Sequence, residues 1–177
     1  MESQAGSHQF DLLYSAAYGA ILRSAYLIVL DIGVAQEITQ EAFLRLWQHR
    51  DRLAPDSNEK AWLMRVATNL AISHRRSLLT RWRLREEAPA SPDPAAVALV
   101  QIELRQMRRA LLSLNSRERA ILALRFAEDL SFAQIGAVIG RPEPTIRTWL
   151  HRALAKLRRR LESSSRTQAN AIAKESS

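Results

Sequence analysis

The stretch LSFAQIGAVIGRPEPTIRTWLHRALAKLRRRL, residues 130–161, decides the fold of the C-terminal part of the chain. Apolar residues at helical spacing after Ser131, a suitable N-cap, predict one helix. Gly140 supplies the left-handed residue that a sharp helix end needs, and Pro142 prevents the helix from continuing. Pro144 suits the first turn of a second helix, because no backbone donor is needed there. Two helices joined by so short a turn make a helix-turn-helix.

The second of these helices separates apolar from polar side chains. The residues expected to pack inward are Ile146, Leu150, Ala153, Leu154 and Leu157. The residues expected to remain outside are Arg147, Thr148, His151, Arg152 and Arg158. In a helix-turn-helix the N-terminal part of the second helix enters the major groove, where Arg and Thr reach base edges or phosphates. A helical hairpin with a solvated basic face is the alternative, and the motif alone indicates no more than binding to duplex DNA.

The positive charge of the chain is concentrated in its C-terminal third. The net charge is +8, and residues 100–163 hold 13 Lys and Arg against 6 Asp and Glu. Residues 1–83 hold 10 against 8. This asymmetry indicates a polyanionic partner for the C-terminal part, with a solvated basic face again as the alternative.

Composition predicts an all-α protein and excludes several classes of site. Leu, Ala and Arg dominate, Gly is scarce at 5 residues, and no segment alternates as a strand does. The absence of cysteine excludes disulfides and thiolate metal sites, and the chain shows no signal for a cofactor. The N-terminus lacks the pattern of a signal peptide, and the longest apolar run, Ala25 to Leu30, is too short to span a bilayer. We therefore expect a cytoplasmic protein with no membrane insertion.

The order of elements predicts two small helical domains. The proline-rich segment 86–98 cannot be crossed by a helix, so we expect a flexible linker there. The expected division is a domain over residues 8–84, a linker over 85–99, a second domain over 100–162 and a disordered tail over 163–177. The expected helices are about Phe10–Leu30, Ala35–Arg50, Asn58–Leu79, Ala96–Ser113, Ser116–Ala127, Ser131–Ile139 and Pro144–Leu161.

Two long motifs resemble a known family. DIGVAQEITQEAFLRLWQHRDRL (31–53) and AWLMRVATNLAISHRR (61–76) resemble region 2 of the extracytoplasmic-function group of sigma-70 RNA polymerase sigma factors. The stretch from Leu114 to Leu161 resembles region 4 of the same group. The resemblance runs from about Tyr14 to Leu161, with the linker where the family has one. It implies two all-α domains, the C-terminal one a winged-helix-like helix-turn-helix domain.

The resemblance implies that the QEAF helix docks on a coiled coil in the clamp of core RNA polymerase. The residues it implies for polymerase binding are Glu37, Gln40, Glu41, Leu44 and Arg45. A polar and charged rim around an exposed Leu is a reasonable protein interface. Without the resemblance, a solvated helix face would be the preferred interpretation.

The resemblance also implies two DNA contacts. For the −10 element, whose bases must leave the stack as the duplex opens, it implies Arg65, Asn69, Arg75 and Arg76. Phosphate contacts are expected from Arg75, Arg76, Arg81 and Arg83, and Trp82 is expected to stack or pack. For the −35 element it implies Arg141, Thr145, Arg147, Thr148, His151 and Arg152. The chain departs from the family pattern at Leu30, Ser73, Pro144 and Trp149, where many members have Gly, Asp, Gly and a basic residue.

These observations predict a sigma factor whose partners are core RNA polymerase, promoter DNA and an anti-sigma factor. An enzyme is disfavoured, because the four histidines are scattered and no set of acid, base and nucleophile can be named. A stand-alone helix-turn-helix regulator is the alternative. It would explain the C-terminal half but leave the QEAF and WLMRVATNLA helices without a task.

Overall fold

The computed structural model describes residues 2–53, 57–78 and 104–175, and it describes side chains over most of these ranges. In chain order the elements are α1 (Glu2–Val29), α2 (Ile32–His49), a 3-10 turn η1 (Arg50–Arg52), α3 (Glu59–Leu78), a helix over 104–112, α5 (Ser116–Leu122), a π-helical turn η2 (Ala123–Ala127), α6 (Phe132–Ile139) and α7 (Glu143–Glu175). The all-α prediction is confirmed. The described residues contain no strand, so the helix-turn-helix has no β-hairpin wing among them. The expected linker, 85–99, lies outside the described residues.

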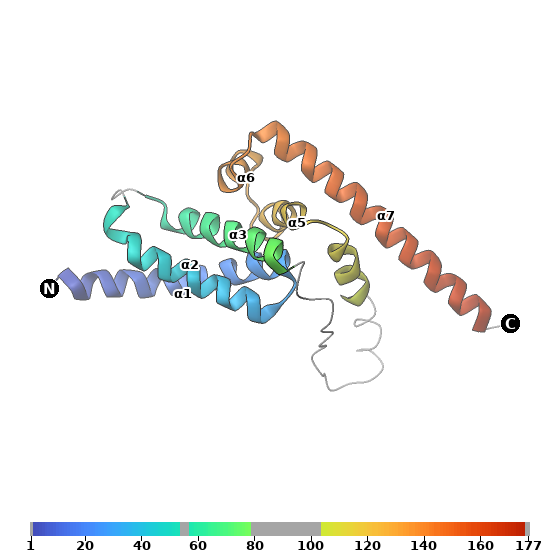
Figure 1. Cartoon of the computed structure of the whole chain (residues 1–177), viewed down its shortest axis with the longest axis horizontal. Coiled ribbons are helices and arrows are strands. Elements are labelled where there is room, and N and C mark those ends of the chain that lie inside the picture. Colours follow the sequence, from blue (N-terminus) through green and yellow to red (C-terminus); the bar gives the residue numbers. More distant parts are fainter. Residues whose placement is uncertain (1, 54–56, 79–103, 176–177) are drawn as a thin grey trace.

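The first three helices form a bundle in which each contacts the other two (Figure 1). Its core is built from apolar residues that recur at helical spacing. The fully buried side chains of this core include Ala17, Ile21, Ile28, Ala42, Leu46, Leu63 and Ala71. The predicted N-cap Asn58 accepts from the Ala61 amide at 2.9 Å. Helix α2 begins at Ile32, earlier than the predicted Ala35, because Asp31 caps it and accepts from the Val34 amide at 3.0 Å.

The segment His8–Val29 of α1 has the length and the apolar content needed to cross a membrane. Core helices of globular proteins pass the same test of length and composition. Helix α1 supplies Ala17, Ile21, Ala25 and Ile28 to the core of the bundle, so its apolar content is used in packing.

The turn between α1 and α2 explains one departure from the family pattern. Leu30 has a φ of +61°, a left-handed conformation in which Gly is favoured. Its side chain is only 5% exposed, so burial compensates for the backbone strain. Leu30→Gly should relieve about 1 kcal/mol of strain but lose about 2–3 kcal/mol of side-chain burial, a net destabilisation that a urea titration would measure.

The turn predicted around Gly140 is confirmed. Ser131 and Gln134 form a capping box at the start of α6, and Gly140 ends the helix with a φ of +72°. Its amide and that of Arg141 both donate to the carbonyl of Gly136, at 2.8 and 3.0 Å. Helix α7 then begins at Glu143, so Pro144 lies in its first turn as expected.

Helix α7 is longer than the sequence predicted. It continues to Glu175, so the segment expected to be a disordered tail from residue 163 is helical to that point. In Figure 1 the second half of α7 projects well beyond the other helices toward the C-terminus. Polar composition indicated fraying, but an unbroken run without Gly or Pro after Pro144 allows the helix to propagate.

The two halves of the chain pack against each other and share one core. Helix α5 contacts α1 and α3, η2 contacts α1, and α6 contacts α3. Figure 1 shows α5 and α6 lying over α3, although both helices are far from α3 in the sequence. Two separate helical domains were expected, and no sequence pattern indicated this contact.

A buried arginine joins the halves. Arg119 is 1% exposed, and its Nε donates to the Ile28 carbonyl of α1 at 2.6 Å. Its Nη1 donates to the carbonyls of Leu114 and Leu111, at 2.6 and 3.2 Å, at the end of the 104–112 helix. One guanidinium therefore satisfies carbonyls at the C-terminal ends of two helices, where a cation is also favoured by the helix dipole.

A second polar contact reinforces the same junction. Glu128, in the turn after η2, accepts from Arg23 at 2.9 Å and from the Ser24 hydroxyl at 3.1 Å, both on α1. The carboxylate is nearly buried, whereas Arg23 is half-exposed. A largely desolvated carboxylate with three donated hydrogen bonds fixes the position of η2 on α1.

Candidate polymerase and nucleic-acid interfaces

The predicted polymerase-binding residues form one face of α2. They recur at positions 37, 40, 41, 44 and 45, opposite the buried Ile38, Ala42 and Leu46. Glu37, Gln40 and Arg45 are exposed and Leu44 is 51% exposed. Glu41 and Arg45 are paired at 2.7 Å. We call these five residues the α2 face.

Aromatic side chains of α1 and α2 form a cluster toward the C-terminal end of α2. Phe43 and Trp47 pack against Phe10 of α1, and the Phe10 and Trp47 rings meet edge to face at 4.9 Å between centroids. The guanidinium of Arg50 lies 3.8 Å over the partly exposed Trp47 ring. The cluster holds α2 rigidly against α1, so the α2 face is presented on a fixed support.

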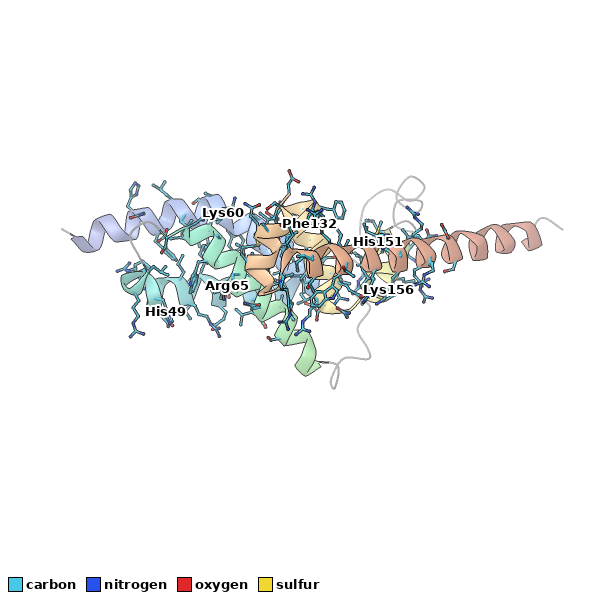
Figure 2. All side chains as sticks on the ribbon, turned by 90° about the horizontal axis from the view of Figure 1, so that it is seen from above. His49, Lys60, Arg65, Phe132, His151 and Lys156 are labelled. Atoms are coloured by element: carbon cyan, nitrogen blue, oxygen red, sulfur yellow. The ribbon has the colours of Figure 1, made fainter. Side chains whose placement is uncertain are left out.

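The structure describes the side chains of only some of the residues predicted to bind the −10 element. Arg65 and Asn69 are both exposed, one turn apart on α3, and Arg65 is labelled in Figure 2. Arg75 and Arg76 lie on the last turns of α3, where the structure describes the backbone but not their side chains. Arg81, Trp82 and Arg83 lie outside the described residues. The structure therefore brings together one exposed polar pair, Arg65 and Asn69.

The predicted −35 residues lie at the start of α7 and in the turn before it. Those that are exposed are Arg141, Arg147, Thr148, His151 and Arg152, whereas Thr145 is half-buried. The opposite side of α7 packs through Ile146, Leu150 and Ala153, as predicted. Leu154 was expected to pack inward but is 39% exposed, because it lies at the edge of the apolar stripe. We call the exposed residues of this set the α7 face.

Basic residues continue along α7 past the predicted set. Lys156, Arg159 and Arg160, with Ser113 and Ser163, line an open cavity of about 330 Å³ beside the end of the 104–112 helix. Lys156 is paired with Glu118 of α5. Figure 2 shows His151 and Lys156 successively along α7. The positive surface therefore extends from the α7 face toward the C-terminal end of the helix.

Two family models match the chain in this order. Sigma-70 region 2 matches residues 13–82, and Sigma-70, region 4, matches residues 104–157. The RNA polymerase sigma-E factor of Streptomyces avermitilis is 32% identical over 161 residues, covering 88% of this chain and 86% of that protein. The ECF RNA polymerase sigma factor SigL of Mycobacterium tuberculosis is 30% identical, covering 85% and 87%, and SigW of Bacillus subtilis is 27% identical, covering 80% and 82%.

Solved structures support the fold. The sigma factor RpoE of Bartonella quintana, crystallised with the anti-sigma factor NepR, has a TM-score of 0.68 at 21% identity, covering 87% of this chain and 97% of that one. CnrH, in complex with the cytosolic domain of CnrY, also has a TM-score of 0.68, at 22% identity, covering 91% and 94%. Both matches span the two halves of the chain. With both regions matched in order and relatives of similar length, the chain belongs to the extracytoplasmic-function group of sigma-70 RNA polymerase sigma factors.

Proposed function

We propose that this sigma factor binds core RNA polymerase through the α2 face, binds the −10 element through α3 and reads the −35 element through the α7 face. The observation that carries the proposal is that two exposed surfaces of different chemical character lie on different helices. The α2 face is polar around an exposed Leu, whereas the α7 face is basic and lies on the second helix of a helix-turn-helix. The first arrangement suits a protein partner and the second suits the major groove.

We propose that the protein acts in the cytoplasm as a non-enzymatic initiation factor. A stand-alone regulator would use the same α7 face but would bind duplex DNA tightly by itself, usually as a dimer on two half-sites. An initiation factor selects a transcription start site only together with core polymerase. Gel-shift titrations with and without core polymerase separate these two functions.

The proposal requires the two halves to separate on a promoter. Elements centred near −10 and −35 lie about 25 base pairs apart, or about 85 Å at about 3.4 Å per pair. In the structure α6 of the helix-turn-helix contacts α3, so α3 and α7 cannot occupy such distant sites together. The packed form is therefore a state that must open when polymerase and DNA bind. We also propose an anti-sigma factor as the regulator that would stabilise a form unable to bind polymerase.

Reversing charge on the α2 face tests the polymerase interface. The double change Gln40→Lys and Glu41→Lys should weaken binding to core polymerase at least about tenfold, because a polar and acidic rim becomes basic beside Arg45. Both side chains lie away from the core, so the thermal midpoint should change little. Binding is measured by fluorescence anisotropy with purified core enzyme. The control is the double change Gln9→Lys and Asp11→Lys, two exposed positions of α1 with the same total change of charge, and equal affinities for the two double variants would contradict the assignment.

Truncating Arg152 tests the α7 face. Arg152→Ala should weaken protection of the −35 element by about 1–3 kcal/mol if the side chain contacts a base edge. The measurement is footprinting of the polymerase complex on a single promoter. Arg105→Ala, which removes the same charge from the exposed side of the 104–112 helix, is the control. Unaltered protection with Arg152→Ala would assign another role to this surface.

A further inference from the structure

Arg147, a residue predicted to contact bases, is held in place by two neighbours that are not among the predicted DNA-binding residues. Glu143, in the first turn of α7, accepts from Arg147 Nε at 3.0 Å and from Nη2 at 2.5 Å through the same oxygen, Oε1. Phe132, at the start of α6, places its ring 4.4 Å from the Arg147 guanidinium carbon. Figure 2 labels Phe132 on α6, next to the start of α7. The guanidinium is thus fixed in its plane by a carboxylate and across its face by a ring.

This arrangement leaves one end of the guanidinium available. A guanidinium carries five N–H donors, and Glu143 uses the Nε hydrogen and one Nη2 hydrogen. The remaining donors lie on Nη1 and on the outer side of Nη2. Two adjacent donors of this kind match O6 and N7 of guanine, the pair that Arg contacts most often in the major groove. The Arg147 side chain remains 59% exposed, so that end is accessible.

Glu143 lies in the first turn of α7, where the helix dipole favours an acidic residue, but its charge lowers affinity for DNA. Its carboxylate is partly exposed and lies in the first turn of the helix expected to enter the groove, where phosphates repel a negative charge. A carboxylate oxygen in the major groove accepts a hydrogen bond from cytosine N4 and is repelled by acceptor edges. Such a group lowers the affinity for most DNA sequences but not for a sequence that presents a donor to it, so specificity increases.

We propose that Glu143 is a specificity-determining residue that sets Arg147 for a guanine in a G·C pair of the upstream element, with Phe132 as the platform for the guanidinium. The inference rests on the proposed reading of that element by the α7 face. It adds two positions to the recognition surface and assigns a base-pair preference to it. It also explains why Arg147 is engaged within the chain before DNA arrives.

The experiment selects −35 sequences from a randomised promoter library with the full chain bound to core polymerase. Wild type should show one position with a strong G·C preference. Glu143→Gln should keep most of the overall affinity, or raise it, while reducing the preference at that position about tenfold. Arg147→Lys should remove the same preference, because an ammonium cannot form the two-donor contact. Phe132→Leu, which keeps an apolar side chain beside the core, should weaken it partially.

Glu162→Gln is the matched control, since it removes the same charge from an exposed position further along α7. If Glu143→Gln raises affinity for all sequences equally and leaves every base preference unchanged, Glu143 is only a surface charge and the inference is wrong. If Arg147→Lys and Arg152→Ala also leave all preferences unchanged, the α7 face does not read the element and the proposed function itself fails. The two failures are therefore distinguishable.

Discussion

Replacing Arg119 by methionine is expected to lower the free energy of unfolding by about 3–5 kcal/mol. The change removes the charge-assisted donor from the buried carbonyls of Ile28 and Leu114, and each buried unsatisfied group costs about 1–3 kcal/mol. The Leu111 carbonyl loses its weaker contact with Arg119 but keeps the Leu114 amide at 3.1 Å. Methionine has a similar length, so little of the loss comes from a cavity. The measurement is a urea titration followed by circular dichroism.

Arg117→Met is the matched control for this prediction. Arg117 lies two residues earlier on α5 and is exposed, so its replacement should change stability by less than about 0.5 kcal/mol. The Arg119 variant should also increase the distance between fluorophores on α3 and α7, because it loses the bond to α1. Equal stability of the two variants, with no change in that distance, would show that Arg119 does not join the halves.

Replacing Gly136 by alanine is expected to cost about 2 kcal/mol and to abolish protection of the −35 element. A Cβ at this position would lie 2.6 Å from the carbonyl oxygen of Arg141, a backbone atom that cannot rotate away. The turn must shift, and the amides of Gly140 and Arg141 lose their fit to the Gly136 carbonyl. Overpacking of this kind costs about 1–3 kcal/mol. Because the turn sets the direction of α7, a small shift moves the α7 face by several ångströms.

The same substitution elsewhere provides the control. Gly19, on the exposed side of α1, has no atom within 4 Å of an added Cβ. Gly19→Ala should therefore stabilise the protein by up to about 1 kcal/mol through helix propensity. Opposite signs for the two variants in thermal melts are the expected result. A stabilising effect at Gly136, with footprints retained, would show that the close approach does not aim the recognition helix.

Local signals in the sequence predicted helix ends well. Ser131, Asn58 and Gly140 act within a few residues of themselves, so their caps and turns follow from side-chain chemistry that does not depend on the rest of the fold. The exposed side of α7 was predictable for the same reason, since apolar periodicity fixes which residues face the core. The edge position Leu154 shows the limit of that argument.

Contacts between distant segments were not predictable. In the segment SRERAIL, Arg117 and Arg119 look alike, yet one is exposed and the other is buried against a carbonyl 91 residues away. The close approach at Gly136 depends on the path of the chain after Gly140. The ion pair between Glu143 and Arg147 could have been predicted from the sequence, because residues four apart on a helix lie side by side. The sequence alone did not explain why many family members have Gly at the position of Leu30, because the reason is the positive φ of that residue.

The packed form also bears on how DNA binding is controlled. The Arg119 and Glu128 contacts hold the helix-turn-helix against α1 and α3. The α7 face is exposed in this form, but it lies too close to α3 for both helices to reach the two proposed promoter elements together. Under the proposed function, polymerase binding on the α2 face would supply the free energy that separates the halves. Binding of both promoter elements would then depend on the presence of polymerase.

The most direct test is transcription by purified core RNA polymerase with and without this chain, with the 5′ ends of the transcripts sequenced. The central claim predicts discrete start sites that appear only with the chain present and share a −35 and a −10 element. It also predicts that the Gln40→Lys and Glu41→Lys double variant loses these starts. Start sites that do not change when the chain is added, together with tight binding of the chain alone to duplex DNA, would contradict the claim.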